Sequence, residues 1–206
     1  MKSPQAFALS EVGDDADNQL SGRAAVFLDR DGTINHEVQY LHDPAKLRLT
    51  RGAARAIRLL NEAQMLVIVV TNQSGIGRGY YSLQAMEAVH RELTRRLSDR
   101  GAHLDAIYYC PHLPTAGCEC RKPRPGLLLR AAVEWGLELS RCTAVGDKVS
   151  DLEAGRRAGC RTVLVLSGHG PQALREFRGL GWQPDVVTKS LLPAVEWILT
   201  QSRLTT

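Results

Sequence analysis

From residue 24 onward, short hydrophobic runs alternate with longer segments whose hydrophobic residues recur every three or four positions. The short runs predict β-strands over residues 24–29, 66–71, 106–110, 143–147, 162–166 and 185–188. The longer segments predict helices over residues 52–63, 82–100, 125–135, 150–158 and 191–200. Hydrophobic strands separated by helices are typical of a parallel sheet covered on both faces. The pattern therefore predicts an α/β fold.

Polar or reactive residues close four of these predicted strands. Asp29, Thr71, Cys110 and Asp147 each stand at a strand end. The carboxyl ends of parallel strands meet at one edge of a sheet, which is where open α/β sheets bind ligands. Each residue alone could belong to an ordinary turn, but together they predict a reaction site at this edge.

Two carboxylates and a glycine follow the first strand, in the sequence Asp29-Arg30-Asp31-Gly32-Thr33. Carboxylates this close can share a hard cation such as Mg²⁺. With the metal neutralising charge, one carboxylate can attack phosphorus while the other transfers protons. The alternative is a simple Asp-Gly turn.

Two further segments offer groups that suit a phosphate. The loop over residues 71–79 combines a hydroxyl, amides and several glycines, although it lacks the Gly-Lys-Ser/Thr ending of a P-loop. Arg121 and Lys122 place two positive charges before a predicted helix. A flexible polar loop and a solvated basic pair are the alternative interpretations.

A second acidic segment, Gly146-Asp147-Lys148-Val149-Ser150-Asp151, closes the fourth predicted strand. Asp147 is placed to supply another oxygen ligand to Mg²⁺. Asp151 can orient Lys122 or a metal-bound water. Helix capping, with Ser150 or Asp147 as the cap, is the alternative.

Three of the five cysteines and one histidine gather in a short stretch: Cys110, His112, Cys118 and Cys120. A tetrahedral shell of thiolates and imidazole is typical of structural zinc. Free thiols in a surface loop are the alternative. We expect the two remaining cysteines, Cys142 and Cys160, to be small core residues, and no disulfide framework.

Composition limits the remaining possibilities. The 206 residues suit one domain, or a core with a small insert. Residues 1–22 hold four acidic side chains and one basic one, and we expect a mobile polar extension there, followed by one domain over 23–206. That domain carries 25 basic against 18 acidic residues, which favours anionic substrates. Scattered basic residues and 5% aromatic content argue against nucleic-acid binding. We expect no membrane span and no secretory signal.

In combination, Asp29-x-Asp31-Gly32-Thr33, Thr71, Lys122 and Gly146-Asp147-x-x-x-Asp151 resemble the four motifs of the haloacid dehalogenase superfamily. The resemblance implies a Rossmann-like three-layer sandwich with a mostly parallel sheet. It implies that Asp29 is the nucleophile, forming an aspartyl-phosphate, and that Asp31 is the general acid/base. Mg²⁺ would be held by the Asp29 carboxylate, the Asp31 carbonyl and Asp147. An acid two residues after the nucleophile resembles the phosphatase branch.

The zinc loop and the following Arg-Lys-Pro resemble the histidinol-phosphatase-like subfamily, which has a small zinc-binding loop and no large cap domain. Within it, the motifs resemble most the branch that removes the 7-phosphate from a heptose 1,7-bisphosphate. Only five residues separate the two pairs of zinc ligands, a spacing similar to that in histidinol phosphatases. Histidinol phosphate is one alternative substrate, and a broad range of sugar phosphates is another. The resemblance also implies a cytoplasmic enzyme of surface-polysaccharide synthesis, and we expect a monomer. The substrate contacts implied are Glu37, Val38, Gln39, Tyr40, Thr71, Asn72, Gln73, Ser74, Arg121, Lys122 and Lys148.

Overall fold

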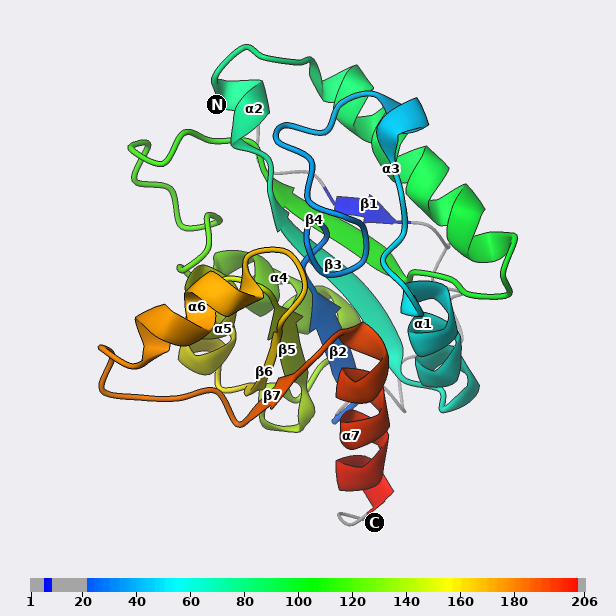
Figure 1. Cartoon of the computed structure of the whole chain (residues 1–206), viewed down its shortest axis with the longest axis vertical. Coiled ribbons are helices and arrows are strands. Elements are labelled where there is room, and N and C mark those ends of the chain that lie inside the picture. The colour runs from blue at the N-terminus through cyan, green and yellow to red at the C-terminus, as the bar shows by residue number, and fades with distance from the viewer. Residues whose placement is uncertain (1–5, 9–21, 204–206) are drawn as a thin grey trace.

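The structure, a computed structural model, describes residues 6–8 and 22–203. Its centre is a sheet with the strand order β1-β4-β3-β2-β5-β6-β7, and helices lie on both sides of it (Figure 1). Among the described strands, only β1 is antiparallel to its neighbour, and the remaining pairs are parallel. The strands are β1 (Ala6–Ala8), β2 (Ala25–Leu28), β3 (Leu66–Asn72), β4 (Ala106–Cys110), β5 (Thr143–Gly146), β6 (Arg161–Val165) and β7 (Val186–Thr188).

The helices form the two outer layers. α1, α3 and α7 share one hydrophobic core with the sheet, and α4, α5 and α6 pack on the opposite face. This confirms the predicted three-layer sandwich, and the described residues include no large cap domain. The helices are α1 (Ala53–Glu62), α2 (Ser74–Gly77), α3 (Leu83–Ser98), α4 (Gly126–Trp135), α5 (Val149–Ala158), α6 (Gly170–Phe177) and α7 (Leu191–Arg203), with short 3-10 turns η1 (Pro44–Lys46) and η2 (Leu139–Arg141).

The central strands are hydrophobic at every position because both of their faces are covered. In β2, Val26 and Leu28 belong to the core beneath α1, α3 and α7. Ala25 and Phe27 point the other way and belong to the core beneath α4 and α5. Alternate side chains of a strand lie on opposite faces, so a strand between two helical layers needs apolar residues in every place.

The connections between strands create a crevice at one edge of the sheet. The chain passes from β2 to β3 and β4 on one side, then crosses back through α4 to β5 on the other side of β2. The loops that follow β2 and β5 therefore run in opposite directions. The crevice between them, where the strand order reverses, is where open α/β sheets bind ligands. This topology brings together the ends of β2 and β5, where Asp29 and Asp147 stand.

One described strand and two described α-helices were not predicted, namely β1, the short α2 and α6, and neither were the turns η1 and η2. A glycine and a proline open α6 and are typical of a turn, yet Ala173 and Phe177, four positions apart, bury one face of this helix. Ala6–Ala8 form β1, and the predicted polar extension otherwise lies outside the described residues, apart from Gly22. In the described part of the chain, no helix has the length and apolar character that crossing a membrane requires.

Candidate active site

The carboxylates at the ends of β2 and β5 meet in a buried cluster. Ligand atoms of Asp29, Asp147 and Asp151 all lie within 4.8 Å of one another, and all three residues are buried. Burial is the largest cause that raises the pKa of Asp29 to about 6, against the opposing charge of Lys122. Burial, together with Asp29 and Asp151, raises the pKa of Asp147 to about 8. The cluster thus concentrates negative charge that a cation would relieve.

Lys122 supplies one positive charge to this cluster. Its Nζ lies 2.6 Å from Asp29 Oδ1 and 2.7 Å from Asp151 Oδ1, and it also donates to the Val70 carbonyl at 2.6 Å. Burial disfavours the charged amine, but the two carboxylates outweigh it and raise the pKa of Lys122. Lys122 is therefore held as a cation beside the carboxylate that the sequence predicts to be the nucleophile.

Asp151 both orients Lys122 and contributes to the cap at the start of α5. One oxygen pairs with Lys122, and the other accepts the backbone N–H of Lys148 at 3.0 Å at the start of α5. The structure makes Lys148 the N-cap of α5, rather than Ser150 or Asp147. Because both Asp151 oxygens are occupied, this residue orients Lys122 and is poorly placed to bind a metal.

Asp147 is the carboxylate that fits a metal best. Its Oδ2 accepts the backbone N–H of His169 at 2.7 Å, whereas its buried Oδ1 has no hydrogen-bond partner among the described residues. A Cβ at Gly32, whose φ is 90°, or at Gly168 would collide with this carboxylate. Leaving a buried carboxylate oxygen without a partner is costly. The oxygen donors here are of the kind that Mg²⁺ binds, so the residues fit that cation.

Asp31 lies beside the cluster, with its carboxylate fixed by three donors. Arg30 approaches at 2.8 Å, Asn35 Nδ2 donates at 3.0 Å and Gln73 Nε2 donates at 3.1 Å. Burial raises the pKa of Asp31, but Arg30 and the hydrogen bonds together outweigh burial and lower it. In this arrangement, Asp31 is a carboxylate that can accept a proton.

The polar loop after β3 holds these groups in place. Gln73 donates to Thr71 Oγ1 at 2.8 Å and accepts from the Tyr81 hydroxyl at 2.7 Å. The Asn72 amide exchanges two hydrogen bonds of 3.1 Å with the backbone of Lys122. The loop therefore links Asp31 and Lys122 mechanically.

A cavity of about 210 Å³ opens in front of Asp31. On its wall, Lys148 Nζ and His169 Nε2 lie 2.9 and 3.4 Å from the same oxygen of Glu37. Tyr40 adopts a left-handed backbone conformation, with φ 55°, and its ring meets Tyr80 edge to face at 4.7 Å. The predicted substrate contacts among the lining residues are Glu37, Val38, Gln39, Tyr40, Asn72, Gln73, Ser74 and Lys148.

Three of the predicted substrate contacts do not line this cavity. Thr71 and Lys122 lie buried behind it, and Arg121 extends toward the carbonyl of His112 at 3.4 Å. Four lining residues were not predicted: Leu41, Gly75, Tyr81 and His169. His169 follows the end of β6, so the same strand-end argument that selected Asp147 could have found it. Nothing in the local pattern marks Tyr81.

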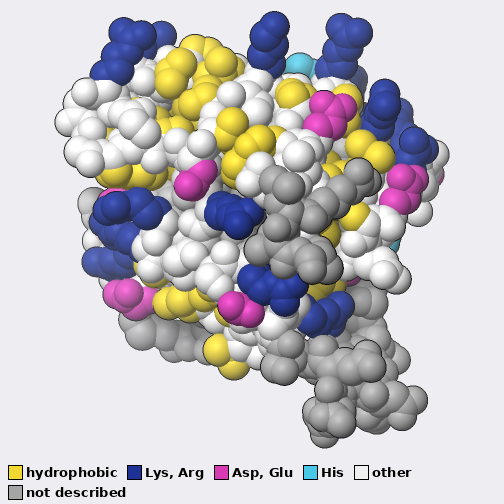
Figure 2. Space-filling model, turned by 90° about the horizontal axis from the view of Figure 1, so that it is seen from below, with side chains coloured by type: hydrophobic (Ala, Val, Ile, Leu, Met, Phe, Trp, Pro, Cys, Tyr) yellow, Lys and Arg dark blue, Asp and Glu magenta, His cyan; other side chains and the backbone are white. Residues whose placement is uncertain are grey.

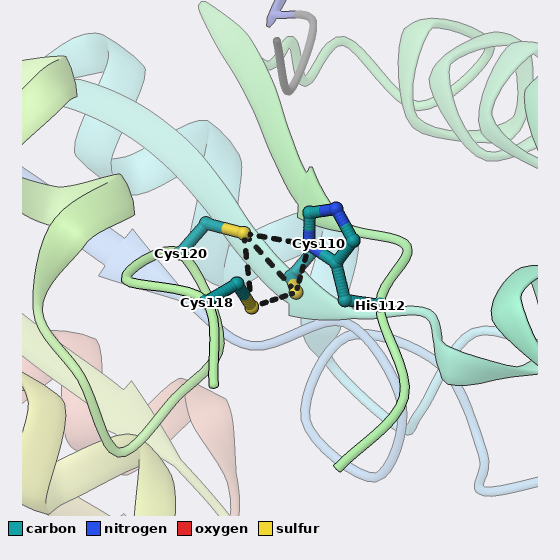
Figure 3. Close-up of side chains that lie close together, drawn as sticks. All are labelled: Cys110, His112, Cys118 and Cys120. Carbon is teal, nitrogen blue, oxygen red and sulfur yellow. Dashed lines mark hydrogen bonds between the residues drawn. The ribbon is translucent and has the colours of Figure 1, made fainter. Parts of the chain in front are cut away.

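The four predicted zinc ligands converge at the end of β4 (Figure 3). Sulfur–sulfur distances are 3.3–3.6 Å, and His112 Nδ1 lies 3.2 and 3.6 Å from the sulfurs of Cys120 and Cys110. A disulfide needs about 2.05 Å, whereas zinc–sulfur bonds of about 2.3 Å place tetrahedral ligands roughly 3.8 Å apart. All five cysteines are free, and this set fits a tetrahedral metal.

Comparisons with known proteins agree with this geometry. A family model described as HAD-hydrolase-like matches residues 119–194. D-glycero-D-manno-heptose-1,7-bisphosphate 7-phosphatase of Thermosynechococcus vestitus is 43% identical, covering 86% of this chain and 96% of the relative. The corresponding Pseudomonas aeruginosa enzyme, named for the β-anomer, is 42% identical over 74% of this chain and 86% of its own length.

A solved structure is also similar. D,D-heptose 1,7-bisphosphate phosphatase from Bordetella bronchiseptica, complexed with magnesium and phosphate, has a TM-score of 0.80 and 35% identity. The match covers 87% of this chain and 99% of that one. Fold, strand-end carboxylates and sequence similarity lead to one conclusion: this chain belongs to the D-glycero-D-manno-heptose-1,7-bisphosphate 7-phosphatase family of haloacid dehalogenase-like hydrolases.

Proposed function

We propose that this protein is a Mg²⁺-dependent phosphatase that removes the 7-phosphate of D-glycero-D-manno-heptose 1,7-bisphosphate. The observation that carries the proposal is the placement of Lys122 between Asp29 and Asp151, next to the unsatisfied Asp147 carboxylate. The family to which the chain belongs supports the choice of substrate.

Magnesium would be held by the carboxylates of Asp29 and Asp147 and by the main-chain carbonyl of Asp31. When bound, it neutralises these carboxylates and the oxygens of the transferring phosphoryl group. The similar enzyme from Bordetella bronchiseptica, whose structure is a complex with magnesium and phosphate, supports this choice of ion.

In the first step, an Asp29 carboxylate oxygen attacks phosphorus in line with the sugar oxygen. The new bond is an acyl phosphate on Asp29, and the broken bond joins phosphorus to the sugar. Asp31 gives a proton to the departing oxygen, which leaves as the heptose hydroxyl. Lys122, fixed at 2.6 Å from Asp29 Oδ1, balances the negative charge that collects around phosphorus.

In the second step, Asp31 takes a proton from a water molecule that attacks the phosphoryl group. The bond between Asp29 and phosphorus breaks, inorganic phosphate leaves and the Asp29 carboxylate is restored. Asp31 loses one proton in the first step and regains one in the second, so it is unchanged at the end of the cycle.

The surroundings of Asp31 set a condition on the first step. Arg30 stabilises the ionised form of Asp31 in the free protein. Donation of a proton requires that this effect be offset, and the negative phosphate entering beside Asp31 does so, because a like charge favours the protonated carboxyl. Asp31 is thus suited to hold its proton only while phosphate occupies the pocket.

We propose that Cys110, His112, Cys118 and Cys120 hold a structural zinc ion. Four protein ligands leave no open coordination position for a substrate. The cluster ends two residues before Lys122, so zinc would fix the loop that delivers Arg121 and Lys122. The short distances between the four ligand atoms support this role.

We propose that the walls of the 210 Å³ cavity bind the heptose. Glu37 offers a carboxylate to sugar hydroxyls, and Lys148 offers a cation to phosphate. Thr71 and Lys122 act from behind the cavity, and Arg121 from the zinc loop. A cytoplasmic location and a monomeric state remain predictions. Light scattering would test the monomeric state.

The direct test is steady-state phosphate release from heptose 1,7-bisphosphate, histidinol phosphate and a panel of simpler sugar phosphates, with and without Mg²⁺. We expect kcat/KM to be highest for the heptose bisphosphate and to depend on Mg²⁺. A higher value for histidinol phosphate would replace the proposed substrate but keep the mechanism. Release from none of them would reject the proposed function.

A further inference from the structure

A second cavity, of about 430 Å³, lies away from the reaction pocket and is lined by four arginines and no acidic residue. Arg48 precedes α1, Arg55 lies in its first turn, and Arg96 and Arg100 lie at the carboxyl end of α3 and just beyond it. Figure 1 shows the segment before α1 (cyan) running beside α3 before it enters α1. Because the segment passes α3, arginines distant in sequence share one concave surface.

Two of these guanidinium groups are held unusually close together. Arg48 Nη1 and Arg96 Nη1 both donate to the Leu47 carbonyl oxygen, at 2.8 and 2.6 Å. The two nitrogens are therefore no farther apart than the sum of these distances. Like charges this close repel each other, and the fold keeps them together through one carbonyl oxygen.

Only one of the four arginines of this cavity, Arg96, is paired with a carboxylate of the described residues. Glu92 pairs with Arg96 but also with Arg95, and it does not line the cavity. Within residues 22–203, no carboxylate forms an ion pair with Arg48, Arg55 or Arg100. On the face seen in Figure 2, Lys and Arg side chains are interspersed with Asp and Glu. Three of the four arginines of the cavity thus carry positive charge that no carboxylate within residues 22–203 pairs with, and Arg96 is paired with Glu92.

We propose that this arginine cavity binds a small anion that carries two or more linked phosphates. Guanidinium groups bind phosphate oxygens through paired N–H donors, and several arginines around one concave surface match several phosphates. A volume of about 430 Å³ suits a small molecule, whereas a duplex or a membrane would need an extended basic face.

The wall of the arginine cavity is bonded to the loop that carries the catalytic groups. The Arg48 carbonyl accepts the His36 N–H at 2.9 Å, and the Thr50 hydroxyl donates to the Thr33 carbonyl at 2.8 Å. Asn35, between these positions, donates to Asp31. An anion bound to the Arg48 side chain would therefore lie on a segment that is hydrogen-bonded to Thr33 and His36, and Asn35 between them donates to Asp31.

The test is a calorimetric titration of the metal-loaded enzyme with inorganic tripolyphosphate. We expect binding to the wild type and a loss of about a hundredfold in affinity for Arg55→Ala/Arg100→Ala, since two arginines are removed and each charge-assisted hydrogen bond is worth about one order of magnitude. Both side chains are exposed, so the variant should fold. Its phosphatase activity without tripolyphosphate should match the wild type.

Arg58→Ala/Arg91→Ala is the matched control, because it removes two exposed arginines, one from α1 and one from α3, that do not line the cavity. This control and Lys148→Ala, in the reaction pocket, should keep wild-type affinity for tripolyphosphate at the arginine cavity. An equal loss of affinity in the two double variants, or no binding of tripolyphosphate by the wild type, would overturn the proposal. Tighter binding of duplex DNA or anionic vesicles through Arg55 and Arg100 would also overturn it, in favour of a macromolecular partner. None of these outcomes depends on the heptose substrate.

Discussion

Two candidate metal centres stand beside each other at one edge of the sheet, and they are built in opposite ways. The sulfur and nitrogen ligands all come from residues 110–120, so they converge within one loop. The carboxylates of Asp29 and Asp147 follow strands that are far apart in sequence and become neighbours only when β2 pairs with β5. Local spacing therefore determines the first centre, and topology determines the second.

The two centres also differ in their electrostatics. The carboxylate cluster contains Lys122, which ties it to the end of the cysteine loop. The set of three cysteines and one histidine contains no such lysine and, as proposed, would hold its metal through thiolates and an imidazole alone. The loop is thus a support for the reacting centre, and changes in the two centres should have different consequences.

The largest effect is expected for Asp29→Asn. Removing the nucleophile should reduce kcat by about 10⁴-fold or more, the scale found when a hydrolase loses its nucleophile. Phosphate release measures the loss, and circular dichroism with thermal melting tests folding. Zinc content should stay at the wild-type value, since the loop is untouched. Turnover close to wild type would end the assignment of Asp29.

Lys122→Met should both lower activity and destabilise the fold. The change leaves Asp29 and Asp151 buried without their shared cation, and breaking a buried pair typically costs about 3–5 kcal/mol. Urea unfolding at pH 7 measures this loss. The double variant Lys122→Met/Asp151→Asn should recover part of the stability but not the activity. If the single variant unfolded at the wild-type urea concentration, the buried pairing would be wrong.

Cys118→Ser should have a smaller effect on turnover and a large effect on zinc. Loss of one of four ligands should lower the bound zinc to well below one ion per chain. We expect the activity to fall through a less ordered Lys122, by less than in Asp29→Asn. Elemental analysis gives the stoichiometry. Cys160→Ala, a buried cysteine outside the set, is the control; equal zinc in both variants would contradict the ligand assignment.

The substitution His90→Leu tests the electrostatic environment on the side of the carboxylate cluster, where Arg30 and Asp31 act on this histidine. His90 is 1% exposed on α3, and neither ring nitrogen has a hydrogen-bond partner among the described residues. Burial, followed by the nearby charge of Arg30, lowers its pKa from 6.5 to about 3. Between these values the unfolded chain binds a proton and the folded chain does not, so stability contributed at pH 7 is lost as the pH falls.

For the wild type, this one group should remove about 2 kcal/mol of unfolding free energy between pH 7 and pH 5. His90→Leu should lack that part of the pH dependence, while other groups contribute equally to both proteins. Urea unfolding at the two pH values measures the difference. Parallel pH profiles for the two proteins would show that the pKa of His90 is not lowered by folding.

Much of the scaffold could be predicted because its signals are local. Strand ends agreed within one residue for β2, β3 and β5, since these strands are hydrophobic on both faces. The α6 helix was missed because its start resembles a turn, and only burial of Phe177 against the sheet makes it a helix. His169 was missed as well, because it lies four positions beyond the end of β6 at Val165, whereas the residues selected from the sequence stand directly at strand ends.

The sequence by itself determined the alternation of strands and helices, the acidic strand ends and the grouping of Cys110, His112, Cys118 and Cys120. These features depend on residues close together in the chain. Only the tertiary structure decided that Lys122 lies between Asp29 and Asp151, that Gln73 fixes Asp31, and that four arginines share a cavity. The reason is physical: such contacts arise from the strand order and the packing of helices, which no short stretch of sequence encodes.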